Sequence, residues 1–192
     1  MTATPNVERT ERTRAALIQA ARAAFATDGY APTSTPRIAE QANVSRGALY
    51  HHFAGKADLF RAVVEYEQAS VAAEILRATS PITNPIDALA AGSDAFLNAM
   101  RDTGRRRILL VDGPAILGPA TMREIDQRHA GSTLAGGIQE AIDRGYLKPL
   151  PPAALADLLS AVFDRLAQVE DTNGDYRQVL DSLLDGITLR RD

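Results

Sequence analysis

The amino-acid sequence predicts an all-α protein, and three observations indicate this fold class. Apolar residues recur at helical spacing along almost the whole chain, as they do in amphipathic helices. Apolar and polar residues rarely alternate, and runs of β-branched residues are scarce, which argues against strands. Short segments that break helices, such as DTG, DGP and GYLKPLPP, divide the chain into pieces of helical length.

The first helix is expected over residues 10–27, after a flexible N-terminal arm formed by residues 1–9. Its apolar stripe includes Ile18 and Phe25, which lie seven residues apart on one helix face. Gly29 lies just past the expected end, in the region where glycine commonly terminates a helix.

Two short helices and a long one are expected next. The first short helix follows Thr33 and Ser34, either of which can cap its N-terminus. Pro36 lies in its first turn, where a missing N–H does no harm. The second short helix follows Ser45, another residue type that caps helices. A long helix then covers about residues 56–77.

The remaining helices are separated by clear breaks. The proline-containing segment TSPITNP, near residues 78–85, predicts a linker. Later helices are expected over residues 85–102, 104–111, 119–145, 152–169 and 175–190. The longest of them contains Gly131, Gly136 and Gly137. Because glycine weakens a helix, we expect a kink, a break or a close helix contact there.

The composition limits the class of protein. The chain has 192 residues, of which 45% are apolar, so it can form a core in one large domain or two small ones. The absence of cysteine excludes disulfides and thiolate metal sites. No apolar run is long enough to span a bilayer and no signal-peptide pattern is present, so we expect a soluble, cytoplasmic protein with no membrane partner.

Charge is distributed unevenly along the chain. The net charge of −3 by itself argues against nucleic acid as a partner. However, residues 1–60 carry seven Lys and Arg against five Asp and Glu, a net charge of +2. Residues 61–192 carry 14 against 19, a net charge of −5. A basic N-terminal part followed by an acidic remainder favours nucleic-acid binding by the N-terminal part. Ordinary fluctuation in composition also explains an excess of only two positive charges.

Two short helices that follow a longer one form the pattern of a helix-turn-helix, whose second helix lies in the DNA major groove. The second short helix begins with an exposed polar turn, in which Arg46 can bind guanine through two hydrogen bonds. Leu49 and Phe53, four residues apart, are expected to face the core. Tyr50 and Lys56 can bind phosphate oxygens. The full set of expected DNA contacts is Thr33, Ser34, Thr35, Ser45, Arg46, Gly47, Ala48, Tyr50, His51, His52 and Lys56.

Residues 12–60 resemble the tetracycline-repressor (TetR) family of bacterial transcriptional regulators. Many positions match at fixed spacing in the segment AALIQAARAAFATDGYAPTSTPRIAEQANVSRGALYHHFAGKADLF. The resemblance implies a DNA-binding head over residues 10–60, with residues 45–53 as the recognition helix. It also implies a helical body over residues 61–192 that binds a small-molecule effector and forms a homodimer. The implied partner is a double-stranded DNA operator with two-fold symmetry.

The body offers two candidate surfaces. Apolar residues at helical spacing along its last two helices favour a four-helix dimer interface, whereas packing against the same chain's core is the alternative. The expected interface comprises Leu155, Leu158, Leu159, Val162, Leu166, Val179, Leu180, Leu183 and Ile187. A second set is expected to line an effector pocket, although core packing explains these side chains equally well. It comprises Val63, Tyr66, Phe96, Met100, Leu109, Met122, Ile125, His129 and Phe163.

Other kinds of site have weaker support. Neighbouring helical residues such as His51 and His52 point in different directions, so we expect no metal there, and no cofactor motif is present. Ser132 near His129 has no oriented acid to form a catalytic triad. The run of arginines at residues 105–107 is typical of a solvated or ion-paired face, and the alternative is a second nucleic-acid patch. We therefore predict a ligand-responsive repressor that is not an enzyme; the alternative is a helical binding module or enzyme that keeps the head as a remnant.

Overall fold

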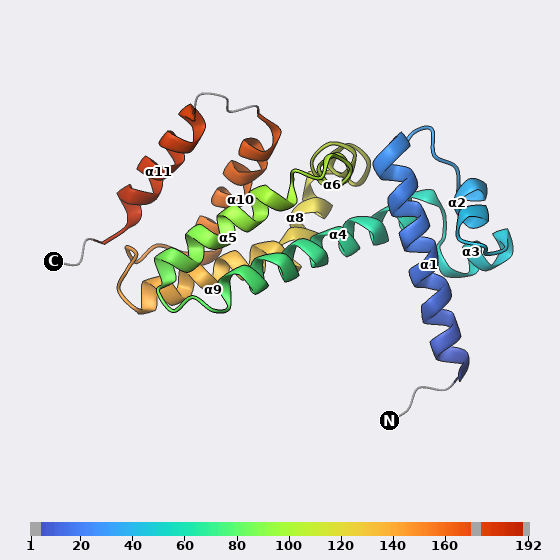
Figure 1. Cartoon of the computed structure of the whole chain (residues 1–192), viewed down its shortest axis with the longest axis horizontal. Helices are drawn as coiled ribbons and strands as arrows, with labels where there is room; N and C mark the ends of the chain where they lie inside the picture. Colours follow the sequence, from blue (N-terminus) through green and yellow to red (C-terminus); the bar gives the residue numbers. More distant parts are fainter. Residues whose placement is uncertain (1–4, 170–173, 190–192) are drawn as a thin grey trace. The chain divides into compact units, whose positions relative to one another are not determined.

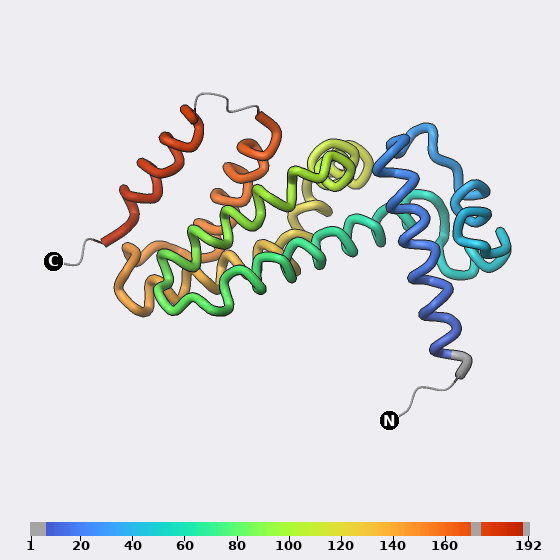
Figure 2. Tube along the Cα trace, in the orientation of Figure 1, coloured from blue at the N-terminus to red at the C-terminus, as the bar shows by residue number. Residues whose placement is uncertain are grey.

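The computed structural model confirms the all-α fold (Figure 1). It describes residues 5–169 and 174–189, and within these ranges the chain forms no strand apart from one isolated antiparallel bridge between Leu147 and Thr188. The backbone path can be followed in Figure 2. The helices are α1 (Pro5–Asp28), α2 (Thr35–Gln41), α3 (Arg46–His52), α4 (Lys56–Thr79), α5 (Pro85–Ala99), α6 (Thr103–Arg107), the π-helical turn η1 (Ile108–Asp112), α7 (Gly113–Leu117), α8 (Pro119–Arg128), α9 (Ala130–Asp143), α10 (Pro152–Gln168) and α11 (Asp175–Ile187).

These helices form two compact units. Among the described residues, the first unit contains those up to Glu67 together with Thr103–Met122, and the second contains the others. Helix α4 therefore begins in the first unit and ends in the second. We expected a single division of the chain in sequence; instead, residues 103–122 pack with the N-terminal helices although they lie far from them in the sequence.

Aromatic packing forms part of the core of the first unit. The ring of Phe25 in α1 lies 5.1 Å, centroid to centroid, from that of Phe60 in α4, in an edge-to-face arrangement. Tyr30 stacks on Phe25 at 5.7 Å and meets Phe60 at 5.0 Å. Such arrangements add stability beyond the area that the rings bury. The three rings join the end of α1 to the first turns of α4, just after the recognition segment.

A buried carboxylate joins three helices of the same unit. Glu67 of α4 is fully buried and accepts from Arg22 of α1 and, at 2.8 Å, from Nε of Arg105 in α6. Arg105, the first arginine of the run at residues 105–107, is thus ion-paired, as expected. Arg107 lies 3.6 Å from Asp112, whose carboxylate also accepts the backbone N–H of Tyr30 at 3.0 Å. These contacts hold residues 103–122 against α1 and α4.

Several helix ends differ from expectation. Helix α1 begins at Pro5, so residues 5–9 are helical and are not part of a flexible arm; residues 1–4 lie outside the described residues. Proline is well suited to the first position of a helix, and Glu8 in the first turn favours the positive end of the helix dipole. The expected helix over residues 104–111 is α6 followed by the π-helical turn η1 and the unexpected helix α7.

The glycines of the expected 119–145 helix mark both a break and close contacts, as predicted. The helix divides into α8 and α9 at His129, whose backbone angles (φ −125°, ψ −104°) are not helical. A Cβ at Gly131 would lie 2.7 Å from a carboxylate oxygen of Asp126, and one at Gly137 would lie 3.1 Å from Cδ2 of Leu89 in α5. Helix α9 therefore approaches α5 closely.

The core of the second unit lies where α9 packs against α5 and α10 (Figure 1). Ile138 and Ala141 of α9, Ala156 of α10 and Leu147 form a buried cluster. The end of α11 is joined to the segment after α9, because the N–H of Lys148 donates to Ile187 O at 2.9 Å. The cavity described below lies beside α5, α9 and α10 of this unit.

Candidate DNA-binding surface and effector cavity

Helix α3 presents its first turn to solvent. Ser45 caps the helix as predicted, because its hydroxyl oxygen accepts the backbone N–H of Ala48 at 3.1 Å. Arg46 and Gly47 are exposed, and Ala48 is half-buried. Beyond the adjoining backbone, the nearest atom to a Cβ added on Gly47 would be the Ser45 hydroxyl oxygen at 4.0 Å, so this turn is open to a close approach by another molecule.

The opposite face of α3 is firmly anchored. Leu49 and Phe53 are buried, as are Ile38 and Ala39 of α2, as the spacing predicted. The connection between the two helices is tight: Asn43 adopts a positive φ of 53°, and Val44 N donates to Ala39 O at 2.9 Å. A buried apolar face thus fixes the helix that carries the exposed turn.

The expected phosphate-binding side chains flank α3. Tyr50 is 55% exposed, and its hydroxyl lies 3.0 Å from Oγ1 of Thr35 at the start of α2. Nζ of Lys56 donates to Ala31 O at 3.0 Å and lies 4.2 Å from the ring centroid of Tyr30. Partial burial lowers the pKa of Lys56 from its ordinary value. The amine is therefore held in place beside the loop that leads to α2.

The two histidines of α3 and the loop before α2 are the remaining parts of the expected DNA-binding surface. His51 is exposed and His52 half-buried, with ring centroids 5.6 Å apart. Ser34 is exposed at the N-cap of α2 but makes no side-chain cap hydrogen bond. Thr33 was wrongly assigned to the surface: it is 2% exposed, and its hydroxyl donates to Gly29 O at 2.7 Å. It stabilises the turn after α1 from inside and is not available to DNA.

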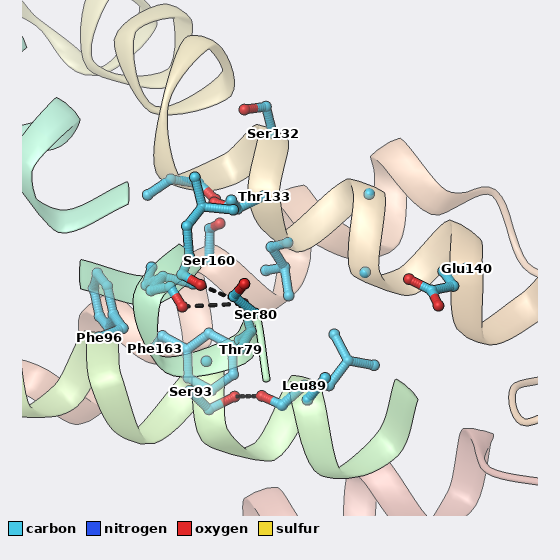
Figure 3. Close-up of a pocket in the computed structure, with 18 of the residues that line it drawn as sticks. Thr79, Ser80, Leu89, Ser93, Phe96, Ser132, Thr133, Glu140, Ser160 and Phe163 are labelled. Carbon is cyan, nitrogen blue, oxygen red and sulfur yellow. Dashed lines mark hydrogen bonds between the residues drawn. The ribbon is translucent and has the colours of Figure 1, made fainter. Parts of the chain in front are cut away.

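A cavity of about 550 Å³ lies within the second unit, bounded by α5, α9, α10 and the last turn of α4 (Figure 3). The rings of Phe96 and Phe163, 6.2 Å apart, form one end of the wall, and Glu140 lies at the other. The apolar part of the wall comprises Ile75, Leu76, Ile82, Ala88, Leu89, Phe96, Ala130, Leu134 and Phe163. The volume is within the range of sites for drug-sized molecules.

Most of the expected pocket residues do not line this cavity; Phe96 and Phe163 do. Four others belong to the first unit, whereas the cavity lies within the second; these are Val63, Tyr66, Leu109 and Met122. Met100 and Ile125 are buried core residues of the second unit, and half-buried His129 lies at the break between α8 and α9. Spacing alone did not distinguish a core side chain from a cavity wall.

The sequence reasoning missed the three acidic residues of the cavity wall, Asp126 of α8, Glu140 of α9 and Asp164 of α10. Burial raises the pKa of Asp164 to about 7, and the nearby carboxyl of Asp126 adds to the shift. Burial also raises the pKa of Asp126, although a hydrogen bond from Ser160 opposes the change. Ser160 and Asp164 are four residues apart and share a helix face with Phe163, a signal that could have identified them.

The expected dimer residues divide into three groups by their exposure. Leu158 of α10 and Val179 and Leu183 of α11 are 66%, 60% and 57% exposed. Leu180 was wrongly assigned to a free surface, because it is buried within its own chain. A third set is partly buried within the chain, which accords with the alternative of intrachain packing for these positions; it comprises Leu155, Leu159, Val162, Leu166 and Ile187.

No described helix is both long and apolar enough to cross a membrane. Among the described residues, no three His, Cys, Asp or Glu side chains are grouped so that they could hold a metal ion.

Two family models match the chain. The model described as bacterial regulatory proteins of the tetR family matches residues 17–63. The model described as a tetracyclin repressor-like C-terminal domain matches residues 86–188, more than half of the chain. The two matches include α3 and the whole cavity-forming segment from α5 onward.

Individual proteins agree with these models. A TetR-family transcriptional regulator from Pectobacterium atrosepticum superposes with a TM-score of 0.79 at 30% identity, covering 99% of this chain and 100% of that one. The transposon Tn10 TetC protein of Escherichia coli is 26% identical over 160 residues, 83% of this chain and 81% of that protein. The HTH-type transcriptional regulator TtgR of Pseudomonas putida is 47% identical over 58 residues, 30% of this chain and 28% of that protein.

Proposed function

The chain belongs to the TetR family of bacterial regulatory proteins, and from this premise we propose how its parts regulate transcription. It is a DNA-binding transcriptional regulator, and regulators of this family bind DNA operators and small-molecule effectors, usually as dimers. The family is not a class of enzymes. The protein acts in the cytoplasm as a repressor that a small molecule releases, without a catalytic step or a cofactor.

One observation carries the proposal: the exposed first turn of α3 stands on a buried apolar face. A helix that enters the major groove needs free side chains at its N-terminal end and a rigid support behind. Arg46 and Gly47 form the exposed N-terminal end, and buried Leu49 and Phe53 form the rigid support. We assign Ser45, Arg46, Gly47 and Ala48 to base edges, with residues 10–60 as the DNA-binding head.

The phosphate contacts surround this turn. Two neighbouring hydroxyl groups come from Tyr50 of α3 and Thr35 of α2. The ammonium group of Lys56 lies just after the end of α3. Ser34, His51 and His52 add exposed or half-exposed polar atoms. Phosphate contacts hold the protein in register without reading sequence, whereas base contacts determine the preferred operator.

A homodimer with two-fold symmetry is proposed through α10 and α11, within a ligand-binding and dimerisation body formed by residues 61–192. The exposed apolar side chains of Leu158, Val179 and Leu183 support this assignment, together with Tyr176, which is 46% exposed. Large exposed apolar groups that gather on two helices mark an interaction surface. Two copies would present their α3 helices to successive major grooves of an operator with matching symmetry.

Release by a small molecule is proposed to act through α4. Its last turn lines the cavity with Ile75, Leu76 and Thr79, while its first residue, Lys56, belongs to the DNA-binding surface. A ligand that favours one position of this helix and an operator that favours another compete through the same element. By linkage, DNA must then weaken ligand binding by the same factor.

Selection of bound sequences from a random double-stranded DNA pool tests the proposal. We expect enrichment of two inverted half-sites about one helical turn, or a multiple of it, apart. The variant Arg46→Ala in the same selection should lose preference at one position of each half-site. Enrichment of no sequence by the native protein would favour the alternative, a helical binding module that keeps the head as a remnant.

A further inference from the structure

The cavity wall is rich in hydrogen-bond acceptors and poor in donors. The described residues that line it include three acids, Asp126, Asp164 and Glu140, and no Lys, Arg or His. They also include no Asn, Gln, Trp or Tyr, which are the neutral side chains that donate N–H or phenolic O–H. The donors that remain are hydroxyl groups.

Most of these hydroxyls donate their hydrogen within the protein. Four of them bond to backbone oxygens of nearby residues: Thr79 to Ile75 O (3.1 Å), Ser93 to Leu89 O (2.8 Å), Ser132 to His129 O (2.7 Å) and Thr133 to Ala130 O (2.6 Å). Figure 3 shows the Ser93 bond, with the labelled hydroxyl residues around the cavity. Ser160 also bonds to the side chain of Asp126. Such hydroxyls offer mainly lone pairs to a ligand.

The charged surroundings of the two aspartates leave room for a cation. The structure assigns no ion pair to Asp126 or Asp164 within the described ranges, whereas Glu140 lies 3.1 Å from Nη1 of Arg144. Asp126 is the charged group that acts on Asp164, and it raises the pKa of that carboxyl. On Asp126, the charge of Asp157 opposes ionisation.

The basic residues His129 and Arg123 do not neutralise this pair. His129 favours the ionised form of Asp126, but burial outweighs it and the pKa of Asp126 is raised. Arg123 lies 3.2 Å from Asp157, outside the cavity wall. A positively charged group bound in the cavity would therefore compensate the negative charge of its two aspartates.

We propose that the effector of this protein is an organic amine: a positively charged ammonium group on an apolar, ring-containing body. The inference rests on the proposed function, because it names the ligand class of the same cavity. Asp164 and Asp126 bind the ammonium group, and the rings of Phe96 and Phe163 contact the apolar body. The acceptor-rich hydroxyls receive any further N–H groups of the ligand.

The pH dependence of ligand binding provides a further test of the inference. A cation binds the ionised carboxylate, so an acidic group with a pKa of about 7 must first lose its proton at lower pH. From this pKa, amine affinity should rise about tenfold between pH 6 and pH 8, because an alkylammonium stays charged over this interval. A neutral ligand that accepts a hydrogen bond from protonated Asp164 would show the opposite trend.

Fluorescence titration of the full chain with a matched pair of probes tests the inference. Dansylcadaverine carries a pentyl chain that ends in a primary ammonium group, and its partner is the same dansyl amide with a terminal hydroxyl. At pH 8 we expect the amine to bind at least about tenfold more tightly than the alcohol, because a charge-assisted bond replaces a neutral one. Asp164→Asn and Asp126→Asn should each reduce this preference, and Asp164→Asn should remove the pH dependence.

The control variant is Asp185→Asn, which changes charge equally at an exposed position of α11 outside the cavity wall. It should leave both affinities unchanged, and circular dichroism should confirm that each variant is folded. An amine that binds no more tightly than the alcohol, including the case in which neither binds at millimolar concentration, overturns the inference. Operator binding, measured on the same preparations, reports separately on the proposed function, which stands if DNA is bound selectively and fails if it is not.

Discussion

Replacing Glu67 with alanine tests whether one buried carboxylate holds the first unit together. Its side chain is 0% exposed and that of Arg105 11%, so their 2.8 Å contact belongs to the buried class of ion pairs. Arg22 is 30% exposed, and its contribution is reduced by solvent screening. Removing one partner of a buried pair costs about 3–5 kcal/mol, and we expect a loss of stability in this range for Glu67→Ala.

The assay is urea unfolding followed by circular dichroism at 222 nm. The control is Glu65→Ala on the same helix, whose contact with Arg61 at 3.5 Å joins two partly exposed side chains. Loss of such a pair costs about 0–1 kcal/mol. If Glu67→Ala unfolds at the same urea concentration as Glu65→Ala, the desolvation of the buried pair cancels its attraction and our account of the unit is wrong.

The remaining predictions concern DNA, assembly and acidity. Arg46→Ala should relax base preference at one position per half-site at a cost of about 1–3 kcal/mol in gel-shift titrations; equal weakening on all sequences would make it a phosphate contact. Lys56→Ala should weaken all sequences alike and lower the slope of log affinity against log salt by about one, whereas an unchanged slope would exclude a phosphate contact. Leu183→Glu should yield monomers in sedimentation, and a monomeric native chain at micromolar concentration would refute the interface. The raised folded-state pKa of Asp164 gives stability that is present below pH 4 and lost as pH rises through 7. The free energy of unfolding should therefore fall by at most about 2–3 kcal/mol from pH 5 to pH 8 in the native protein, and by less in Asp164→Asn. Identical pH profiles for the native protein and this variant would contradict the prediction.

The sequence determined features that depend on neighbours along the chain. Helical periodicity gave the fold class, Ser45 identified a cap, and Leu49 and Phe53 identified the buried face of α3. These predictions succeeded because capping and amphipathic spacing act within one or two turns of a helix. The glycines from Gly131 onward likewise indicated a local weakness, and the break at His129 follows from it.

Tertiary structure alone decided which side chains meet across the chain. Thr33 is a common surface residue type, yet the turn after α1 buries it; Leu180 fits a dimer stripe, yet its own chain covers it. From the sequence alone, Glu67 would be placed on the exposed face of a helix. In the folded chain, Arg22 and Arg105 contact it from helices far away in sequence. Burial results from such long-range packing, which periodicity does not encode.

The cavity shows the same limit most clearly. Its wall joins the end of α4 to α5, α9 and α10, and its acids come from α8, α9 and α10. A sequence pattern marks each helix face as apolar, but it does not show where two faces fail to fill the space between them. That space, and the raised pKa of Asp164 beside it, depend on distances between helices that only the folded chain fixes.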